Sequence, residues 1–179
     1  MRNKEKNYAF IDSNNLYLGV SGDIYKKKSK IYAGWKLDYK RFRVYLREKY
    51  GVEKAFIFIG FKPGNQAMYT NLQESGYICI FKPTLELADG KVKGNVDSEL
   101  VLHSMIEFQN YEKAVIVSGD GDFYCLVEYF IGKNKLKKVL VPNQYGYSSL
   151  LDRLSTPVNN ILDFINILKN KLEYGGKYK

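Results

Sequence analysis

The sequence predicts an α/β fold, a doubly wound sandwich with a mostly parallel central sheet. Short apolar segments rich in β-branched and aromatic residues alternate along the chain with longer segments of helical periodicity. Connections between such strands are right-handed, so helices are expected on both faces of the sheet. A length of 179 residues and a hydrophobic content of 45% suit one folded domain over residues 1–179, with residues 173–179 as a frayed tail.

Strand-like segments recur along the chain. They span residues 8–11, 54–59, 77–81, 114–117 and 137–141, and a short edge strand is expected at 160–162. The segment 114–117 is apolar throughout and is followed by the turn sequence Ser118-Gly-Asp-Gly, so we expect it to be buried on both faces. Gly60 and Pro142 end the strands that precede them.

Helices are expected between the strands. They cover residues 38–49, 65–75, 123–130 and 148–154, and another opens at Asn95 or Asp97 and extends to 108. Shorter helices start near Leu16 and after Asp163. Asp38 is placed to cap the first of the longer helices, and Met68 and Leu72 are predicted to face the core. Residues 19–36 combine several glycines with a run of lysines, which predicts a mobile basic loop.

The composition favours an anionic partner. The formal net charge is +9, the sequence pI is about 9.3, and 16 tyrosines and 10 phenylalanines accompany the basic residues. Aromatic rings beside cations suit single-stranded nucleic acid, because bases stack on the rings and phosphates pair with the cations. The composition therefore points to nucleic acid or another polyanion.

Other features argue against several classes of protein. Cys79 and Cys125 are far apart in apolar contexts, which predicts reduced, buried thiols in a cytoplasmic protein. No apolar run reaches the roughly 18 residues of a membrane span, and the polar start does not resemble a signal peptide. Neither a Walker A sequence nor a complete dinucleotide fingerprint occurs, so no nucleotide cofactor is expected. His103 is the sole histidine and is expected to have a structural or solvent-facing role.

Four aspartates are predicted to meet at one edge of the sheet. Asp12 follows the first strand, and Asp120 and Asp122 follow the segment 114–117. The carboxyl ends of parallel strands share one edge, where open α/β sheets bind ligands, and Asp97 can reach that edge from the start of its helix. Each residue also has an ordinary explanation, as a helix cap, a turn residue or a first-turn acid.

Carboxylates gathered in this way would repel one another unless a cation lay between them. Oxygen ligands favour Mg²⁺ or Mn²⁺ over zinc. A site of this kind can polarise a phosphodiester and lower the pKa of a bound water for in-line attack. Asn15 is expected to contact a phosphate or to hold Asp12 in place, and the Ser118 hydroxyl to hydrogen-bond a carboxylate.

Three motifs carry a family resemblance. They are Ile11-Asp-Ser-Asn-Asn-Leu16, Lys93-Gly-Asn-Val-Asp97 and Val117-Ser-Gly-Asp-Gly-Asp-Phe123, in an order and spacing that extend from about Tyr8 to Leu154. Together they resemble the NYN domain, specifically its LabA-like branch, which belongs to the PIN-like nuclease group. Two features depart from the family pattern: Asn95, where relatives usually carry an apolar or acidic residue, and a basic loop that the family does not share.

The resemblance implies a PIN-like sandwich and a Mg²⁺- or Mn²⁺-dependent ribonuclease site. By this resemblance, the acidic metal shell and catalytic set comprise Asp12, Asp97, Asp120 and Asp122, with Asn15 and Ser118 as supporting residues. Lys93 matches the basic residue of the second motif and is expected to contact a phosphate. RNA is the implied partner, and a homodimer or a regulatory protein partner is left open.

Further basic residues are predicted to bind RNA. Lys26, Lys27 and Lys28 form a run in the basic loop, and Lys40 and Arg41 follow shortly after on the helix at 38–49. Their clustering favours a surface that contacts phosphates. A solvated basic face is the ordinary alternative.

Three function classes remain open at this point. The first is a metal-dependent endoribonuclease, and the second is a non-catalytic RNA-binding or regulatory module that keeps the same fold. The third is a different phosphotransfer enzyme with an acidic cluster. A Toprim-type site usually has Glu as its upstream acid, and a haloacid-dehalogenase-type phosphatase needs Asp-x-Asp after the first strand, where this chain has Asp12-Ser-Asn14. Both variants of the third class therefore fit less well.

Overall fold

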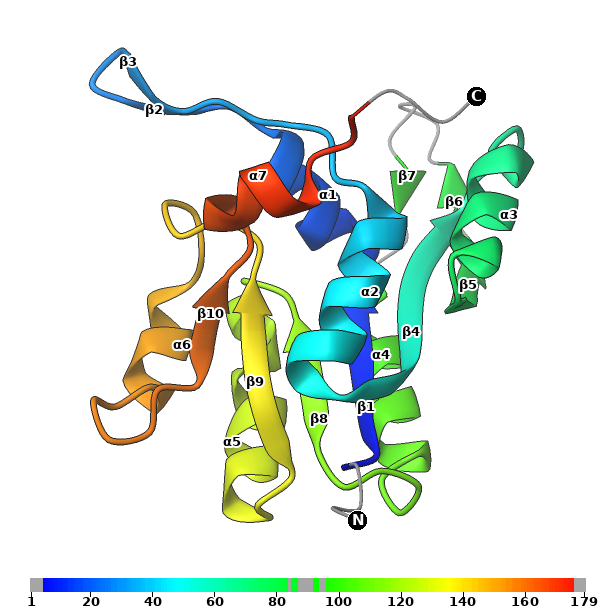
Figure 1. Ribbon diagram of the computed structural model, residues 1–179, viewed down its shortest axis with the longest axis vertical. Coiled ribbons are helices and arrows are strands. Elements are labelled where there is room, and N and C mark those ends of the chain that lie inside the picture. Colours follow the sequence, from blue (N-terminus) through cyan, green and yellow to red (C-terminus); the bar gives the residue numbers. More distant parts are fainter. Residues whose placement is uncertain (1–4, 84, 87–91, 94–95, 176–179) are drawn as a thin grey trace.

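The computed structural model describes residues 5–83, 85–86, 92–93 and 96–175, and a six-stranded parallel sheet lies at its centre (Figure 1). The strand order is β10-β9-β8-β1-β4-β5. The strands are β1 (Asn7–Asp12), β4 (Val52–Phe61), β5 (Tyr77–Pro83), β8 (Ala114–Val117), β9 (Leu136–Val141) and β10 (Leu162–Phe164). The predicted doubly wound α/β class is confirmed.

The strand order contains one point where the winding reverses. β1 and β8 are neighbours, with Tyr8 opposite Ala114 and Ile11 opposite Val117. From β1 the chain proceeds to β4 and β5 on one side, and from β8 it proceeds to β9 and β10 on the other. In open α/β sheets such a switch point leaves a crevice at the carboxyl ends of the strands, where ligands bind.

Helices cover both faces of the sheet (Figure 1). They are α1 (Ser13–Ser21), α2 (Tyr39–Tyr50), α3 (Gln66–Glu74), α4 (Asp97–Ile106), α5 (Tyr124–Gly132), α6 (Ser149–Leu154) and α7 (Lys169–Leu172), with 3₁₀ turns η1 (Gly121–Phe123) and η2 (Asn166–Leu168). One layer buries Leu16, Phe42 and Leu72 from α1, α2 and α3. The other layer buries Leu100 and Val127 from α4 and α5. Each core lies between the sheet and one helical layer.

The bounds of α2 follow from its sequence. The Asp38 carboxylate accepts a hydrogen bond from the backbone N–H of Arg41 at 3.0 Å, which satisfies a donor that the first turn leaves free. Gly51 ends the helix with a φ of 67°, a conformation that glycine adopts without steric cost. The predicted cap at Asp38 is confirmed.

Residues 24–32 form a hairpin that projects from the body of the protein (Figure 1). It pairs β2 (Ile24–Lys26) with β3 (Ser29–Tyr32), so the predicted mobile loop is wrong for this part of residues 19–36. Lys27 and Lys28 form its turn with φ values of 47° and 66°. Such turns usually carry Asn-Gly, so a pair of lysines gave no turn signal. A second short hairpin pairs β6 (Leu85–Glu86) with β7 (Val92–Lys93).

Other differences concern single positions. Met68 is 44% exposed, and Tyr69 takes the inward place beside Leu72. The edge strand falls at 162–164 rather than 160–162, so Asp163 lies within β10 instead of capping a helix. Glu173 forms an isolated bridge with Leu37 rather than starting a frayed tail, whereas residues 176–179 lie outside the described ranges.

None of the helices in the described ranges combines the length and the apolar character needed to cross a bilayer.

Candidate metal centre

Asp12 lies at the switch point, where β1 ends and α1 begins. One of its carboxylate oxygens accepts hydrogen bonds from the backbone N–H groups of Asn14 (3.1 Å) and Asn15 (3.0 Å). Its other oxygen is 3.4 Å from the Ser118 hydroxyl, which donates to it. The side chain is therefore fixed by α1 on one side and by the end of β8 on the other.

The electrostatic surroundings of Asp12 disfavour its charged form. Burial raises the pKa of the carboxyl group, and the nearby carboxylates of Asp97 and Asp120 raise it as well. The N–H groups of Asn15 and Asn14 lower the pKa, but the net shift is upward. A cation at this point would offset both unfavourable effects.

Three other carboxylates gather beside this position. One oxygen from each of Asp97, Asp120 and Asp122 lies within 4.8 Å of the other two. Asp97 is the first residue of α4, and Asp120 caps η1 by accepting from the N–H of Asp122 at 3.0 Å. Segments distant in the sequence thus bring acidic groups together, as predicted. Asp12 lies outside this set of three.

The donor set fits a hard divalent cation. Opposite ligands of an octahedral Mg²⁺ lie about 4.2 Å apart, since each Mg–O distance is about 2.1 Å. Only one pair among three ligands can be opposite, and adjacent ligands lie about 3.0 Å apart, so oxygens within 4.8 Å of one another would each need to move by up to about 1 Å to bind one ion. Within the described ranges, no salt bridge joins Asp120 or Asp122 to a lysine or arginine. Mg²⁺ or Mn²⁺ therefore suits the chemistry of these ligands.

Asn15 and Ser118 hold the turn that carries the acids. The Asn15 side-chain oxygen accepts from the backbone N–H of Gly119 at 2.8 Å, which ties α1 to the end of β8. The Ser118 hydroxyl accepts from the N–H of Asp120 at 3.2 Å. Ser118 thus contacts a carboxylate, as expected, whereas the Asn15 side chain holds the Gly119 backbone and not Asp12. Their supporting role in a metal site stays a prediction.

The start of α6 also supports the turn that carries the acids, and the sequence analysis did not predict this contact. The Ser148 N–H donates to the carbonyl oxygen of Gly119 at 2.9 Å. A Cβ on Gly121 would lie 2.3 Å from the Ser148 hydroxyl oxygen, and one on Gly119 would lie 2.9 Å from the Cβ of Tyr147. The paired glycines in the Ser-Gly-Asp-Gly sequence were the available signal for this close approach.

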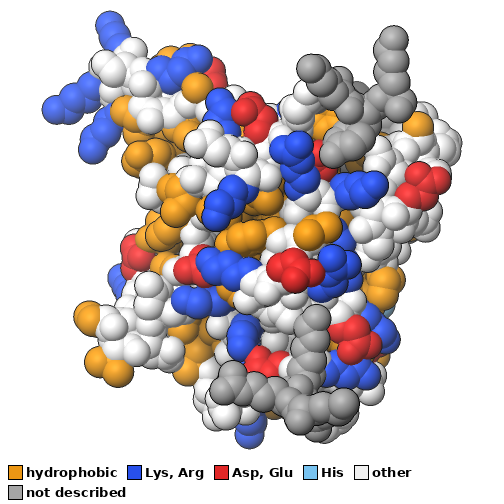
Figure 2. Space-filling model, viewed as in Figure 1, with side chains coloured by type: hydrophobic (Ala, Val, Ile, Leu, Met, Phe, Trp, Pro, Cys, Tyr) orange, Lys and Arg blue, Asp and Glu red, His pale blue; other side chains and the backbone are white. Residues whose placement is uncertain are grey.

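The predicted RNA-binding residues lie in several places. Lys26, Lys27 and Lys28 are exposed on the hairpin, where Figure 2 shows basic side chains at the upper left. Lys40 is exposed on the first turn of α2. The Arg41 guanidinium instead donates to the carbonyl oxygen of Glu173 at 3.0 Å, so part of its hydrogen-bonding capacity is used within the fold.

Three further predictions concern Lys93, the two cysteines and His103. Lys93 is in β7, but its side chain lies outside the part of the chain that the structure describes. Cys79 is half-buried, whereas Cys125 is exposed, so the prediction of two buried thiols is wrong for Cys125. Cys125 follows the first residue of α5 and lies on its outer face, a position that its apolar neighbours in sequence did not reveal. The His103 ring packs against Phe58, with ring centroids 5.6 Å apart.

A protein-family model matches most of the chain. The NYN domain model matches residues 8–154, which include all four aspartates. The chain belongs to the NYN domain family. This family is part of the PIN-like nuclease group, and the three gathered carboxylates fit the metal site of such a nuclease.

The NYN match agrees with a structural likeness. A crystal structure of a protein of unknown function from Vibrio parahaemolyticus covers 96% of this chain and 99% of its own length, with a TM-score of 0.68 and 23% sequence identity. At this level of identity the likeness supports the fold alone. Among curated proteins, no match to the chain is found.

Proposed function

We propose that this NYN domain is a metal-dependent endoribonuclease that hydrolyses RNA phosphodiesters at a Mg²⁺ or Mn²⁺ site. The observation that carries the proposal is the convergence of Asp97, Asp120 and Asp122 within 4.8 Å. They lie beside Asp12, at the switch point of a parallel sheet. Carboxylates at this spacing repel one another, and a divalent cation bound between them would stabilise the arrangement.

The proposed roles follow from the contacts. Asp97, Asp120 and Asp122 hold the metal, and Asp12 adds negative charge from a buried position next to them. A divalent cation bound there polarises the phosphodiester and supplies an activated water, so no dedicated side-chain base is required. Asn15 and Ser118 keep α1 and the Gly119 turn in register, which fixes the carboxylates relative to one another.

We further propose that the hairpin lysines bind the phosphates of RNA. Non-glycine residues at positive φ cost roughly 1 kcal/mol or more each, because the side chain is crowded by the backbone. Lys27 and Lys28 have this unfavourable conformation at the tip of a hairpin that projects from the body of the protein, and both side chains are exposed. Phosphate contact by Lys40 and Lys93, membership of the LabA-like branch, and a homodimer or protein partner all remain predictions.

A cleavage assay with matched variants tests the proposed function. Wild-type protein should cleave single-stranded or structured RNA in Mg²⁺ or Mn²⁺ and lose activity in EDTA. Asp120→Asn should abolish cleavage and keep RNA binding. Asp23→Asn is the control, because Asp23 pairs with Lys30 on the hairpin side of the molecule at 2.5 Å and lies outside the acidic set.

The same assay distinguishes the main alternative. If neither wild type nor Asp120→Asn cleaves RNA while salt-sensitive binding persists, a non-catalytic RNA-binding module is favoured instead. Retained cleavage in Asp120→Asn would contradict the proposed metal site directly.

A further inference from the structure

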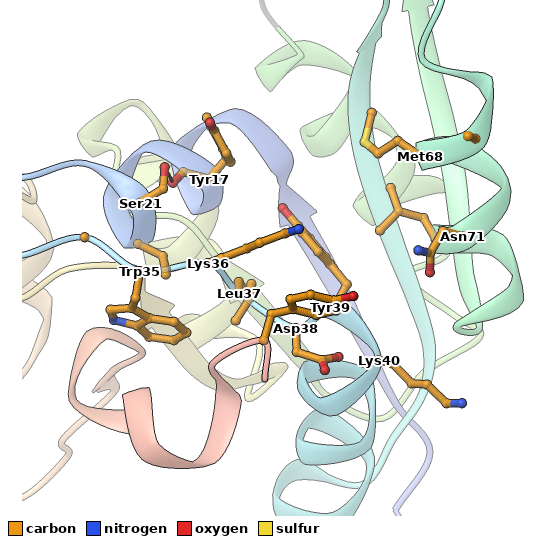
Figure 3. Close-up of a pocket in the computed structure, with 15 residues that line it drawn as sticks. Tyr17, Ser21, Trp35, Lys36, Leu37, Asp38, Tyr39, Lys40, Met68 and Asn71 are labelled. Atoms are coloured by element: carbon orange, nitrogen blue, oxygen red, sulfur yellow. Dashed lines mark hydrogen bonds between the residues drawn. The ribbon is translucent and has the colours of Figure 1, made fainter. Parts of the chain in front are cut away.

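A pocket of about 1040 Å³ lies between α1, α3 and the segment that leads into α2 (Figure 3). The described residues that line it include none of the four aspartates. Its volume is at the upper end of the range typical of small-ligand sites, which is about 300–1,000 Å³. It is therefore large enough for a nucleotide and is separate from the acidic site.

Flat aromatic side chains form much of its surface. Tyr17 projects from α1 and is 60% exposed, so its ring is available for stacking. Tyr39, Tyr174 and Trp35 also line the pocket, and the Trp35 side chain is almost fully buried in the wall. Every nucleobase presents a π face to such rings, so stacking on them requires no particular sequence.

The charges in the pocket favour an anion. The Asp38 carboxylate caps α2 and lies 3.6 Å from the Arg41 guanidinium, so its charge is largely offset. Lys36 and Lys40 have no carboxylate partner in the described ranges, and Lys36 extends into the space between α1 and α3 (Figure 3). Its ammonium group lies over the Tyr174 ring, 4.3 Å from the centroid. A phosphate entering here would meet these two cations, and the Asp38 carboxylate that also lines the pocket is buried beside Arg41.

The remaining polar side chains of the pocket can form hydrogen bonds with the edge of a nucleobase. Asn71 lines the pocket from α3, opposite Tyr17 and Ser21 on α1 (Figure 3). A side-chain amide offers a donor and an acceptor side by side, which matches the edge of a base. Burial, and to a smaller degree the Tyr17 hydroxyl, raises the pKa of Tyr39 to about 12, so Tyr39 carries no negative charge at neutral pH.

Helix α1 connects the pocket with the acidic site. Asp12 caps its first turn, and Tyr17 follows five residues later, a rise of about 7.5 Å along the helix axis. A single strand lying along α1 would thus have one phosphate near the carboxylates and a neighbouring base near Tyr17. A duplex would keep its bases paired and unavailable for the pocket.

We propose that this pocket binds an unstacked nucleotide of single-stranded RNA, with the base on Tyr17 and its phosphate at Lys36 or Lys40. The inference rests on the proposed ribonuclease function and names the form of substrate that the site accepts. A duplex and a free mononucleotide are the competing occupants that the experiment separates.

Trp35 gives a direct readout, because it is the only tryptophan of the chain and lines the pocket. The probe is a single-stranded RNA oligonucleotide, titrated in EDTA so that no cleavage occurs. Binding should change the Trp35 emission saturably, and a duplex of the same sequence should not. Tyr17→Ala should weaken binding about 5- to 150-fold, the range expected for one lost base–aromatic stack.

Matched controls lie on the opposite helical layer. Tyr129 on α5 is 42% exposed, and the Lys133 ammonium group lies 5.6 Å from its ring centroid, so this pair resembles Tyr174 and Lys36 in chemistry but not in position. Tyr129→Ala and Lys133→Met should leave affinity unchanged. Lys36→Met should lower the slope of log affinity against log salt by about 0.7, as expected for one lost phosphate contact to a single strand.

The outcomes separate this inference from the proposed function. If RNA is bound and cleaved but the Trp35 emission does not respond, or if Tyr17→Ala behaves like Tyr129→Ala, the pocket assignment is overturned and the nuclease proposal stands. If Asp120→Asn still cleaves RNA while Trp35 responds and Tyr17→Ala weakens binding, the metal site is overturned and the pocket stands. Equal responses to a duplex, or a response to a free mononucleotide alone, would also overturn the pocket assignment.

Discussion

Replacing Asp120 with Asn should have opposite effects on stability in the absence and presence of metal. The variant keeps the shape of the side chain and an oxygen that can still accept from the Asp122 N–H, so the cap of η1 survives. It removes one charge from a set of three whose oxygens lie within 4.8 Å. At that separation each repulsive pair costs about 1 kcal/mol in a water-like medium and about 3.5 kcal/mol at an effective dielectric of 20.

Because Asp122 is exposed, the lower figure applies to its pair, and the half-buried Asp97 pair lies between the limits. Without metal and at low salt, Asp120→Asn should therefore be more stable than wild type by about 2–4 kcal/mol, the sum of the two repulsive pairs that Asp120 makes. With Mn²⁺ at about 100 times its dissociation constant, wild type should gain about 2.7 kcal/mol from binding, and the variant much less. The stability advantage of the variant should then become much smaller or reverse.

Urea unfolding followed by circular dichroism, in EDTA and in Mn²⁺, measures both effects. Asp23→Asn should show neither, since Asp23 pairs with Lys30 and removing it relieves no repulsion. If Asp120→Asn were less stable than wild type in EDTA, or if Mn²⁺ stabilised both proteins equally, the reasoning about this cluster would be refuted.

Two other variants test local features of the fold. Lys27→Asn with Lys28→Gly should stabilise the hairpin turn by about 1 kcal/mol for each relieved residue and should weaken RNA binding at low salt, as measured by hydrogen exchange and by a binding titration. Unchanged affinity would argue against phosphate contact by these lysines. Gly121→Ala should cost about 1–3 kcal/mol and weaken Mn²⁺ binding, because its Cβ would lie 2.3 Å from the Ser148 hydroxyl oxygen. Gly132→Ala, with no atom within 4 Å of its Cβ, is the control, and equal losses in both variants would contradict this account.

The central strands and the acidic site could be predicted because their signals are local. The apolar segment 114–117 and the turn after it identify a buried strand with acids at its end. Because the strands are parallel, Asp12 can be placed at the same edge of the sheet even when the neighbours of its strand are unknown. The family match over residues 8–154 agrees with that reasoning.

The features that sequence reasoning missed depend on contacts between distant residues. The pocket brings together residues from α1, α3 and the segment before α2, so no single stretch carries its signature. Tyr69 replaces Met68 as the buried residue because it packs against Phe61 and Phe81 of the neighbouring strands, with centroids 5.8 and 4.9 Å away. Asp163 reads as a helix cap locally, whereas its carboxylate accepts from the Tyr50 hydroxyl at 2.6 Å.

Asp12 differs from the other three aspartates in the hydrogen bonds that its carboxylate oxygens already accept. Two backbone N–H groups and the Ser118 hydroxyl occupy three of its roughly four acceptor positions, which leaves one for a metal ion. Its pKa is raised, chiefly by burial and then by neighbouring carboxylates, so it gives up its proton at higher pH than an ordinary aspartate. In the metal-free protein, stability should consequently fall as the pH rises through this raised pKa, because the folded state holds the proton more tightly.

Metal binding should show the converse dependence. A protonated Asp12 neither attracts nor ligates a cation, so Mn²⁺ affinity should fall as the pH is lowered through the raised pKa of this group. Asp12→Asn keeps an acceptor for the Asn14 and Asn15 N–H groups but carries no charge, so it should bind Mn²⁺ more weakly and lose this component of the pH profile. Titrations between about pH 4 and pH 7 measure both quantities. If the two proteins gave the same profile, Asp12 would serve as a helix cap alone, and its charge would contribute nothing to metal binding.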